Sequence, residues 1–333
     1  MMAETINITT MAEVLSDEVF AEFFWKKVGP TNENWPCEDT DAHGVKTHPS
    51  DVVFYYDEPY SNTRTYINCD LKSYAQQSIT SIAIKGAIES LAKQTSCAER
   101  SEAWQKKHVH DGVIPNICSL LFVYNHDGGY DKSFAKSLDA VSYEKLGIPK
   151  GSKIVVFGPE DVFWLDNVRY EIRHMRGSLA EDKLPAPEHC RFFYPQLERK
   201  ANIQLDKAKA ATLEMLTSPL IVLEYQRDNK GGAKGFVLFY RRSGDKSQEF
   251  TYLLDYLRHY QLLNDNTEIQ IKLLEASVNA PAMFQKAVQN YVEALAGEGP
   301  DNSLSERVKA IKFKKVNQMH TTFSTVELGM DYE

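Results

Sequence analysis

The sequence predicts an α/β fold in two units. Segments in which apolar residues recur at helical spacing alternate with short apolar runs rich in Val, Ile, Phe and Tyr, the pattern of helices packed on sheets. The chain has 333 residues, 43% hydrophobic and 25% charged, which is ordinary globular composition and enough for one large or two modest domains. With 17 Gly and 13 Pro it is neither collagen-like nor of low complexity, and it shows no internal sequence repeat.

The first element is predicted to be a helix. Apolar side chains recur at helical spacing over residues 20–28, behind the polar pair Ser16 and Asp17, and the Gly-Pro pair that follows ends the helix. Residues 31–50 are polar and rich in turn formers, so we expect them to connect this helix to the sheet.

The remaining elements of the first unit follow the same alternation. A hairpin-type connection joins its first two strands. In chain order, the expected elements are strands at residues 51–56 and 64–72, a helix at 79–93, strands at 118–124 and 153–157, and a helix at 160–176.

A loop-like stretch with two prolines, residues 181–187, is the best boundary between the units. It divides the chain into a domain at residues 1–180 and a second, smaller α/β domain at residues 181–333. The elements expected in the second domain are a helix near residues 203–216, a hairpin of strands 220–225 and 235–241 over a turn at 229–232, a helix at 250–263, a strand at 268–274, a helix at 281–295 and terminal strands.

Charge and hydropathy exclude several classes of protein. The net charge of −8 argues against a protein that coats nucleic acid by bulk charge. The apolar runs are far too short to span a membrane, and the first residues lack the basic start of a secretory signal. The five cysteines show no short metal-binding spacing and fit free thiols in a reducing compartment. We therefore expect a soluble cytoplasmic protein with no membrane partner.

One segment is basic against this acidic background. Residues 307–315 carry five positive charges and no acid. A solvated strand face explains such a run, and contact with a phosphate backbone is the alternative. The basic side chains are Arg307, Lys309, Lys312, Lys314 and Lys315.

Two acids and a lysine stand out on the paired strands of the first unit. Alternate residues of a strand share a face, so Asp70 and Lys72 lie together while Cys69 points into the core on the other side. Asp51 opens the neighbouring strand, so these three side chains could converge at one end of a sheet. Two carboxylates that hold Mg²⁺, with a lysine to orient the attacking water or stabilise the phosphate oxygens, form the set that phosphodiester hydrolysis requires.

The short pattern acid-x-Lys is not informative without its context. It occurs four times, about as often as chance would give. Only one occurrence ends an apolar strand that follows a second strand opened by an acid. The four pairs are Asp70 and Lys72, Glu181 and Lys183, Glu198 and Lys200, and Asp228 and Lys230.

At these residues the chain resembles the restriction-endonuclease-like, or PD-(D/E)xK, nuclease superfamily. In that family an acid begins one strand and acid-x-Lys ends the next; Asp51 matches the first position, and Asp70 with Lys72 matches the second. The resemblance covers residues 14–95. The fold that it implies, a mixed sheet flanked by helices, could extend to about residue 180.

The first helix adds to the resemblance. Residues 18–29 look like the helix that opens Mrr-type members, and Glu18, or Glu22 one turn later, matches the acid that this helix often contributes. The chain also departs from the family pattern, because a serine separates the usual Pro-Asp pair and the second acid is Asp rather than the commoner Glu. Asp57 and Glu58 are rival first acids that lie closer to the turn.

The resemblance implies an Mg²⁺-dependent endonuclease in which Mn²⁺ can substitute. By family precedent DNA is favoured over RNA, and bacterial restriction or phage defence is the expected setting. Because the chain is acidic, a regulatory partner or a homo-oligomer is expected to control it, and the second domain would recognise substrate or partner. The implied roles are metal binding by Asp51, Asp70 and Glu18 or Glu22, positioning of water and phosphate by Lys72, and nucleic-acid contact by Gln76, Gln77, Lys309, Lys312, Lys314 and Lys315.

The rival from another class is a non-catalytic nuclease-like scaffold or specificity subunit. Convergence of Asp51, Asp70 and Lys72 within reach of one cation discriminates between the two. Other candidate constellations are weaker: a two-histidine metal site at His108 and His110, a cation loop over residues 125–131, and a base-stacking stripe of Tyr252, Tyr256 and Tyr260.

Overall fold

The computed structural model describes residues 2–180, 183–195, 208–227, 234–264, 267–298, 302–316 and 318–319, with the backbone alone at residues 2–11, 296–298 and 302. These residues form two compact units, one within residues 2–166 and one within residues 167–319. The division falls inside helix α6 (Pro159–Gly177), whereas the sequence analysis places it at residue 180. In this part of the chain no helix has both the length and the apolar character needed to cross a bilayer.

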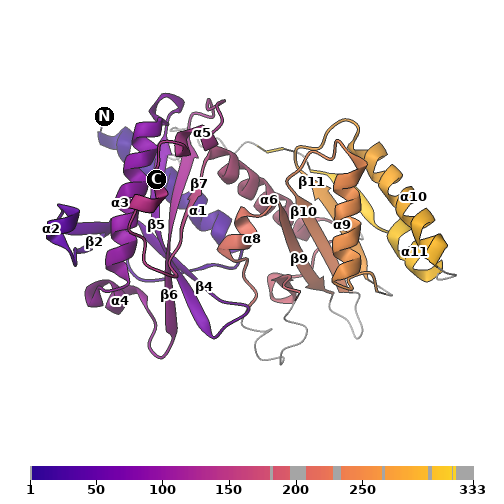
Figure 1. The fold of residues 1–333 in the computed structure, drawn as a ribbon, viewed down its shortest axis with the longest axis horizontal. Helices are drawn as coiled ribbons and strands as arrows, with labels where there is room; N and C mark the ends of the chain where they lie inside the picture. The colour runs from indigo at the N-terminus through magenta and orange to yellow at the C-terminus, as the bar shows by residue number, and fades with distance from the viewer. Residues whose placement is uncertain are drawn as a thin grey trace. The chain divides into compact units, whose positions relative to one another are not determined.

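The first unit is built on a mixed sheet, as the resemblance implies, and this sheet has five strands (Figure 1). Its strand order is β1-β4-β5-β6-β7, in which the β1/β4 and β4/β5 pairs are antiparallel and the β5/β6 and β6/β7 pairs are parallel. The strands are β1 (Lys26–Lys27), β4 (Val52–Asp57), β5 (Thr63–Tyr74), β6 (Ile114–Asn125) and β7 (Ile154–Phe157).

Helices cover both faces of this sheet. On one face, Phe20 of α1 (Met2–Glu22) packs against Phe54 of β4 and Phe122 of β6, with ring centroids 5.2 and 5.8 Å apart. On the other face lies α3 (Ser81–Ala98), whose Ile84, Ile88 and Leu91 share a buried cluster with side chains of β6. The smaller helices of the unit are α2 (Thr40–His43), α4 (Glu102–His108) and α5 (Ala135–Leu138), with 3-10 turns at Gln76–Ser78 and Tyr143–Lys145.

The first helix ends earlier than predicted. It stops at Glu22 because Phe24 adopts a left-handed conformation with φ of 63°, and the N–H groups of Phe24 and Trp25 bond back to the carbonyls of Ala21 and Phe20. The helix expected to begin behind Ser16 and Asp17 and to end before Gly29 is therefore wrong at both ends, since α1 begins at Met2.

Four further elements were not predicted. The polar stretch 31–50 contains the antiparallel strands β2 (Glu33–Pro36) and β3 (Thr47–Ser50), with α2 between them. Asp39 caps α2 through the backbone N–H of Ala42. The helix α4 was also missed, and it places His108 at a helix end rather than on a strand.

The second unit contains another five-stranded mixed sheet, of order β8-β9-β10-β11-β12. Its β8/β9 and β9/β10 pairs are antiparallel, and its β10/β11 and β11/β12 pairs are parallel. The strands are β8 (Cys190–Phe192), β9 (Leu220–Gln226), β10 (Lys234–Tyr240), β11 (Glu268–Leu273) and β12 (Lys312–Lys315). This sheet therefore repeats the order and the strand senses of the first, although the sequence shows no repeat.

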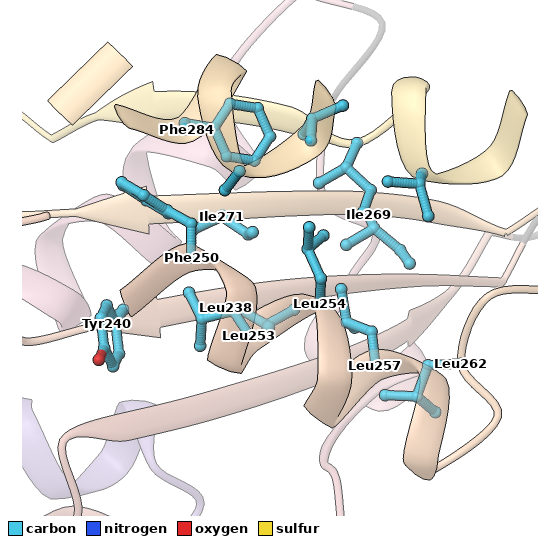
Figure 2. Close-up of a cluster of buried hydrophobic side chains, with 14 of the residues drawn as sticks. Leu238, Tyr240, Phe250, Leu253, Leu254, Leu257, Leu262, Ile269, Ile271 and Phe284 are labelled. Atoms are coloured by element: carbon cyan, nitrogen blue, oxygen red, sulfur yellow. The ribbon is translucent and has the colours of Figure 1, made fainter. Parts of the chain in front are cut away.

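One long helix lies between β10 and β11, as α3 lies between β5 and β6. It is α9 (Ser247–His259), whose apolar side chains pack on Leu238, Ile269 and Ile271 of the sheet and on Phe284 of α10 (Figure 2). The hairpin of β9 and β10 confirms the prediction, and the turn expected at 229–232 lies outside the described residues. The other helices are α8 (Leu213–Thr217), α10 (Ala280–Glu298) and α11 (Asn302–Lys309), with a 3-10 turn at Pro187–His189.

Two predictions in the second unit need correction. The helix expected near 203–216 lies partly outside the described residues, and of its described part only α8, which begins at Leu213, is helical. The terminal segment is not strand throughout its described residues, because α11 carries Arg307 and Lys309 and is followed by the strand β12.

Candidate active site

The register of β4 and β5 places two acids opposite each other. Val52 of β4 pairs with Cys69 of β5 in the antiparallel ladder. Asp51 directly precedes β4, so the next step of the same register sets it against Asp70. The Asp51 carboxylate also accepts a 2.7 Å hydrogen bond from the backbone N–H of Leu71, which holds it at β5.

Lys72 lies beside Asp70 on the same face of β5. Its Nζ is 2.5 Å from Oδ1 of Asp70, and the side chains are 30% and 9% exposed. This is the face that α3 covers, because Asn68, two residues before Asp70, donates to Gln94 of α3. Cys69 is fully buried on the opposite face, as predicted. The structure therefore brings together Asp51, Asp70 and Lys72.

The two carboxylates disfavour each other's charge. Burial raises the pKa of Asp51 from 3.8 to about 6; the Leu71 N–H opposes this rise, the charge of Asp70 adds to it, and Lys72 opposes it. A hydrogen bond between the carboxyl groups of Asp51 and Asp70 further favours the protonated form of Asp51. The pair is thus arranged to share a positive charge, either a proton or a cation.

Lys72 is favoured in its charged form, unlike Asp51. Its burial lowers the pKa, but the nearby charges of Asp70 and Asp51 outweigh that effect and raise the pKa above its ordinary value. Lys72 is therefore a fixed positive charge at neutral pH, held in place by its ion pair with Asp70.

The helix acid remains a prediction. Glu22 is 7% exposed and Glu18 is half-buried, both on α1, which packs on the face of the sheet opposite Asp70. Among the described residues, neither glutamate forms with Asp51 and Asp70 a set of three acids whose ligand atoms all lie within 4.8 Å of one another.

The rival first acids lie elsewhere. Asp57 is at the other end of β4, where its carboxylate forms a 2.8 Å ion pair with Arg64. Glu58 follows the strand and accepts a hydrogen bond from the Thr65 hydroxyl. Both acids already serve as partners within the hairpin that joins β4 to β5.

The two glutamines after Lys72 have different surroundings. The Gln76 side chain donates to Asp131 at 3.2 Å, and its backbone N–H donates to the Asp127 carboxylate. Asp127 also accepts from the N–H of Gly129, so the loop over residues 125–131 is held by internal caps. Gln77 is exposed on the same 3-10 turn and remains the better candidate for nucleic-acid contact.

The basic residues near the C-terminus are divided between two elements. Lys309 is on α11 and pairs with Glu306 at 2.9 Å, whereas Lys312, Lys314 and Lys315 are exposed on β12, an edge strand of the second sheet. The Lys315 ammonium donates to the carbonyl of Ser277.

The second sheet carries no matching acid pair. The corresponding strand ends, where β9 begins and β10 finishes, hold residues 218–220 (Ser-Pro-Leu) and 240–243 (Tyr-Arg-Arg-Ser). Neither segment contains a carboxylate. Of the two sheets, only the first therefore has the acid and lysine arrangement.

The side chains of the other constellations have partners within the protein. His108 lies against the Val28 carbonyl at 3.3 Å, whereas His110 bonds the Tyr66 hydroxyl at 2.9 Å. Tyr256 and Tyr260 pack edge to face, with ring centroids 4.8 Å apart.

One group of side chains was missed by the sequence analysis. Cys37, His43, His48 and Cys97 lie together in the first unit. The available signal was the spacing of Cys37, His43 and His48 within 12 residues, but Cys97 is distant in sequence, so no complete ligand set could be recognised.

Comparison with known protein families agrees with the geometry. Residues 1–161, just under half of the chain, match the model of the GAPS4 protein PD-(D/E)XK nuclease domain. Searches of curated proteins and of solved structures gave no significant match. The matched segment contains Asp51, Asp70 and Lys72 and nearly all of the first unit. Over residues 1–161 the chain is therefore similar to nuclease domains of the PD-(D/E)XK superfamily.

Proposed function

We propose that the first unit is a divalent-metal-dependent endonuclease that acts on DNA in preference to RNA. The observation that carries this proposal is the convergence of Asp51, Asp70 and Lys72 at one end of the β4/β5 pair. A scaffold that had lost activity would have no need to keep a half-buried and a buried carboxylate together at the cost of a raised Asp51 pKa.

The donor set fits Mg²⁺, with Mn²⁺ as a substitute. Asp51 and Asp70 offer carboxylate oxygens, the ligands that Mg²⁺ prefers, and a cation would replace the proton that this pair otherwise favours. Glu18 or Glu22 is proposed to complete the set. When bound there, the metal supplies positive charge for the scissile phosphate and makes the attacking water more acidic.

Lys72 is proposed to act on the phosphate and on the nucleophile. Its ammonium group is charged, anchored by Asp70 and 30% exposed, so it can donate to a phosphate oxygen or orient a water from a fixed position. Leu71 lies between the two functional residues of β5, and its N–H fixes the Asp51 carboxylate relative to both.

The second unit is proposed to recognise substrate or partner. It lacks the acid pair at the corresponding strand ends, and its edge strand β12 presents Lys312 and Lys314. The acidic chain suggests control by a regulatory partner or a homo-oligomer, and a role in bacterial restriction or phage defence is the setting that we favour.

Cleavage assays test the proposal. Plasmid, linear duplex, single-stranded DNA and RNA are incubated with the full chain in Mg²⁺, Mn²⁺ or EDTA. Asp70→Asn and Lys72→Ala are expected to lower the rate by at least about 100-fold. Asp57→Asn is the matched control, because Asp57 lies on the same hairpin but at the other end of β4.

The outcomes separate the alternatives. Equal cutting by wild type and both variants would indicate a contaminant and contradict the site. If no preparation cuts, calorimetry with Mn²⁺ decides: binding that Asp70→Asn abolishes supports a nuclease that awaits a partner, whereas absence of binding supports the non-catalytic scaffold.

A further inference from the structure

A second group of ligand-bearing side chains lies in the first unit, outside the carboxylate site. Cys37 directly follows β2, His43 ends α2, His48 lies on β3, and Cys97 is the next-to-last residue of α3. One ligand atom from each of these four residues lies within 4.8 Å of all the others. In the described part of the chain, no other three Cys, His, Asp or Glu side chains gather their ligand atoms in this way.

The distances match the edges of a tetrahedral metal site. The two sulfur atoms are 3.7 Å apart, and Nδ1 of His43 is 3.3 Å from Cys37 Sγ and 3.4 Å from Cys97 Sγ. A tetrahedral ion with bonds of about 2.3 Å to sulfur and about 2.0 Å to nitrogen would separate two sulfurs by about 3.8 Å and a sulfur from a nitrogen by about 3.5 Å. A disulfide would need sulfurs about 2.05 Å apart.

The fourth residue has a buried nitrogen with no partner. His48 is 3% exposed, and its Nε2 has no hydrogen-bond partner. Leaving a buried polar atom unsatisfied is costly, so this atom points to a ligand.

Backbone N–H groups donate hydrogen bonds to both sulfurs. The N–H of Asp39 donates to Cys37 Sγ at 3.4 Å, and the N–H of Glu38 donates to Cys97. Hydrogen bonds of this kind stabilise a thiolate and orient it toward a metal. The short loop after β2 therefore supplies both a ligand and the donors that support the two sulfurs.

We propose that Cys37, His43, His48 and Cys97 bind a structural Zn²⁺ ion. Four sulfur and nitrogen ligands in tetrahedral arrangement are the preferred set of this metal, and four protein ligands leave no open coordination position for a substrate. The ion would fasten the β2–α2–β3 segment to the end of α3. Since β3 ends at Ser50, it would also fix the chain that leads into Asp51.

Metal analysis of the full chain tests this proposal. Protein purified under reducing conditions without chelator is expected to contain about one zinc per chain by elemental analysis. Exchange with Co²⁺ is expected to give the intense visible absorption of a tetrahedral ion and a thiolate charge-transfer band. Cys97→Ser should lose the zinc, and Cys118→Ser, which alters a buried cysteine elsewhere in the unit, should keep it.

Two variants at His43 test the proposal even if Cys97→Ser does not fold. His43 is only half-buried at the end of α2, so substitutions there are tolerated best. His43→Cys restores a ligand and should retain zinc, whereas His43→Ala should lose it or bind it at least about tenfold more weakly. The proposal is overturned if wild type holds no zinc and gives no Co²⁺ spectrum, if His43→Ala binds zinc as tightly as wild type, or if mass spectrometry finds Cys37 and Cys97 joined by a disulfide.

Discussion

The carboxylate of Asp51 accepts a 2.7 Å hydrogen bond from the backbone N–H of Leu71, the residue between Asp70 and Lys72. This bond ties the residue before β4 to the last part of β5 and holds the half-buried Asp51 carboxylate against the buried Asp70 carboxylate. The raised pKa of Asp51 shows that the arrangement is costly without a positive charge between the acids. A cation bound between the two acids would relieve this cost.

Asp51→Asn is expected to stabilise the metal-free protein at neutral and alkaline pH. The amide keeps an oxygen that can accept from Leu71 but carries no charge to bury or to oppose Asp70. Because the pKa rises from 3.8 to about 6, the gain should be roughly 1–3 kcal/mol in the free energy of unfolding near pH 8. Urea denaturation in EDTA measures it.

The sign of the pH dependence checks the cause. A folded-state pKa above the unfolded value means that folding takes up a proton between about pH 4 and pH 6. The stability that protonation of Asp51 supplies is complete below that window and is lost as pH rises through about 6. The difference between Asp51→Asn and wild type should therefore vanish near pH 4; a constant difference from pH 4 to 8 would contradict the prediction.

Mn²⁺ binding should weaken as pH falls through about 6. The metal competes with the proton that the two acids favour, so its apparent affinity should fall by up to about tenfold per pH unit below the Asp51 pKa. Calorimetry over this range measures the effect, with the protons released read from buffers of different ionisation enthalpy. Binding that is independent of pH would assign the metal to other ligands.

The local parts of the site were predictable from sequence, and the reasons are geometric. Residues two apart on a strand share a face, so the pairing of Asp70 with Lys72 follows from alternation alone. Asp51 lies opposite Asp70 across a hairpin with a short connection, and contacts between neighbouring strands of a hairpin can be predicted from the sequence. The end of α1 could not be predicted, because Phe24 adopts a left-handed conformation that is uncommon for its residue type.

Distant contacts account for what was missed. Cys97 joins Cys37 across 60 positions, and only the fold shows that the end of α3 reaches the β2–α2–β3 segment. The shared strand order of the two sheets could not be predicted from sequence either. Core residues such as Leu238 and Ile271 form an apolar pattern that any buried sheet has. Strand order depends on how the connections cross the sheet rather than on particular residues. Two sheets can therefore share a topology without sharing a sequence pattern.

Lys312 and Lys314 are expected to contribute to nucleic-acid affinity by binding phosphates. If each lysine binds one phosphate, the variant Lys312→Ala/Lys314→Ala should bind more weakly, and the slope of log affinity against log salt should become shallower by about 0.9 for each lysine replaced. Fluorescence anisotropy at several salt concentrations measures the slope. The control is Lys106→Ala, an exposed lysine of the first unit. Equal slopes for wild type and the double variant would show that the basic side chains of residues 307–315 are solvated and do not bind phosphates.

Glu171→Gln is expected to destabilise the second unit by about 3–5 kcal/mol, because it leaves a buried charge without its partner. Lys272 of β11 is 4% exposed, and its ammonium lies 2.5 Å from Glu171 in the latter half of α6. Removing both charges avoids that cost, so Glu171→Leu/Lys272→Met should recover most of the stability. Urea denaturation of the single and double variants measures the coupling. If the double variant loses as much stability as Glu171→Gln, the loss comes from packing around α6 rather than from the unpaired ammonium of Lys272.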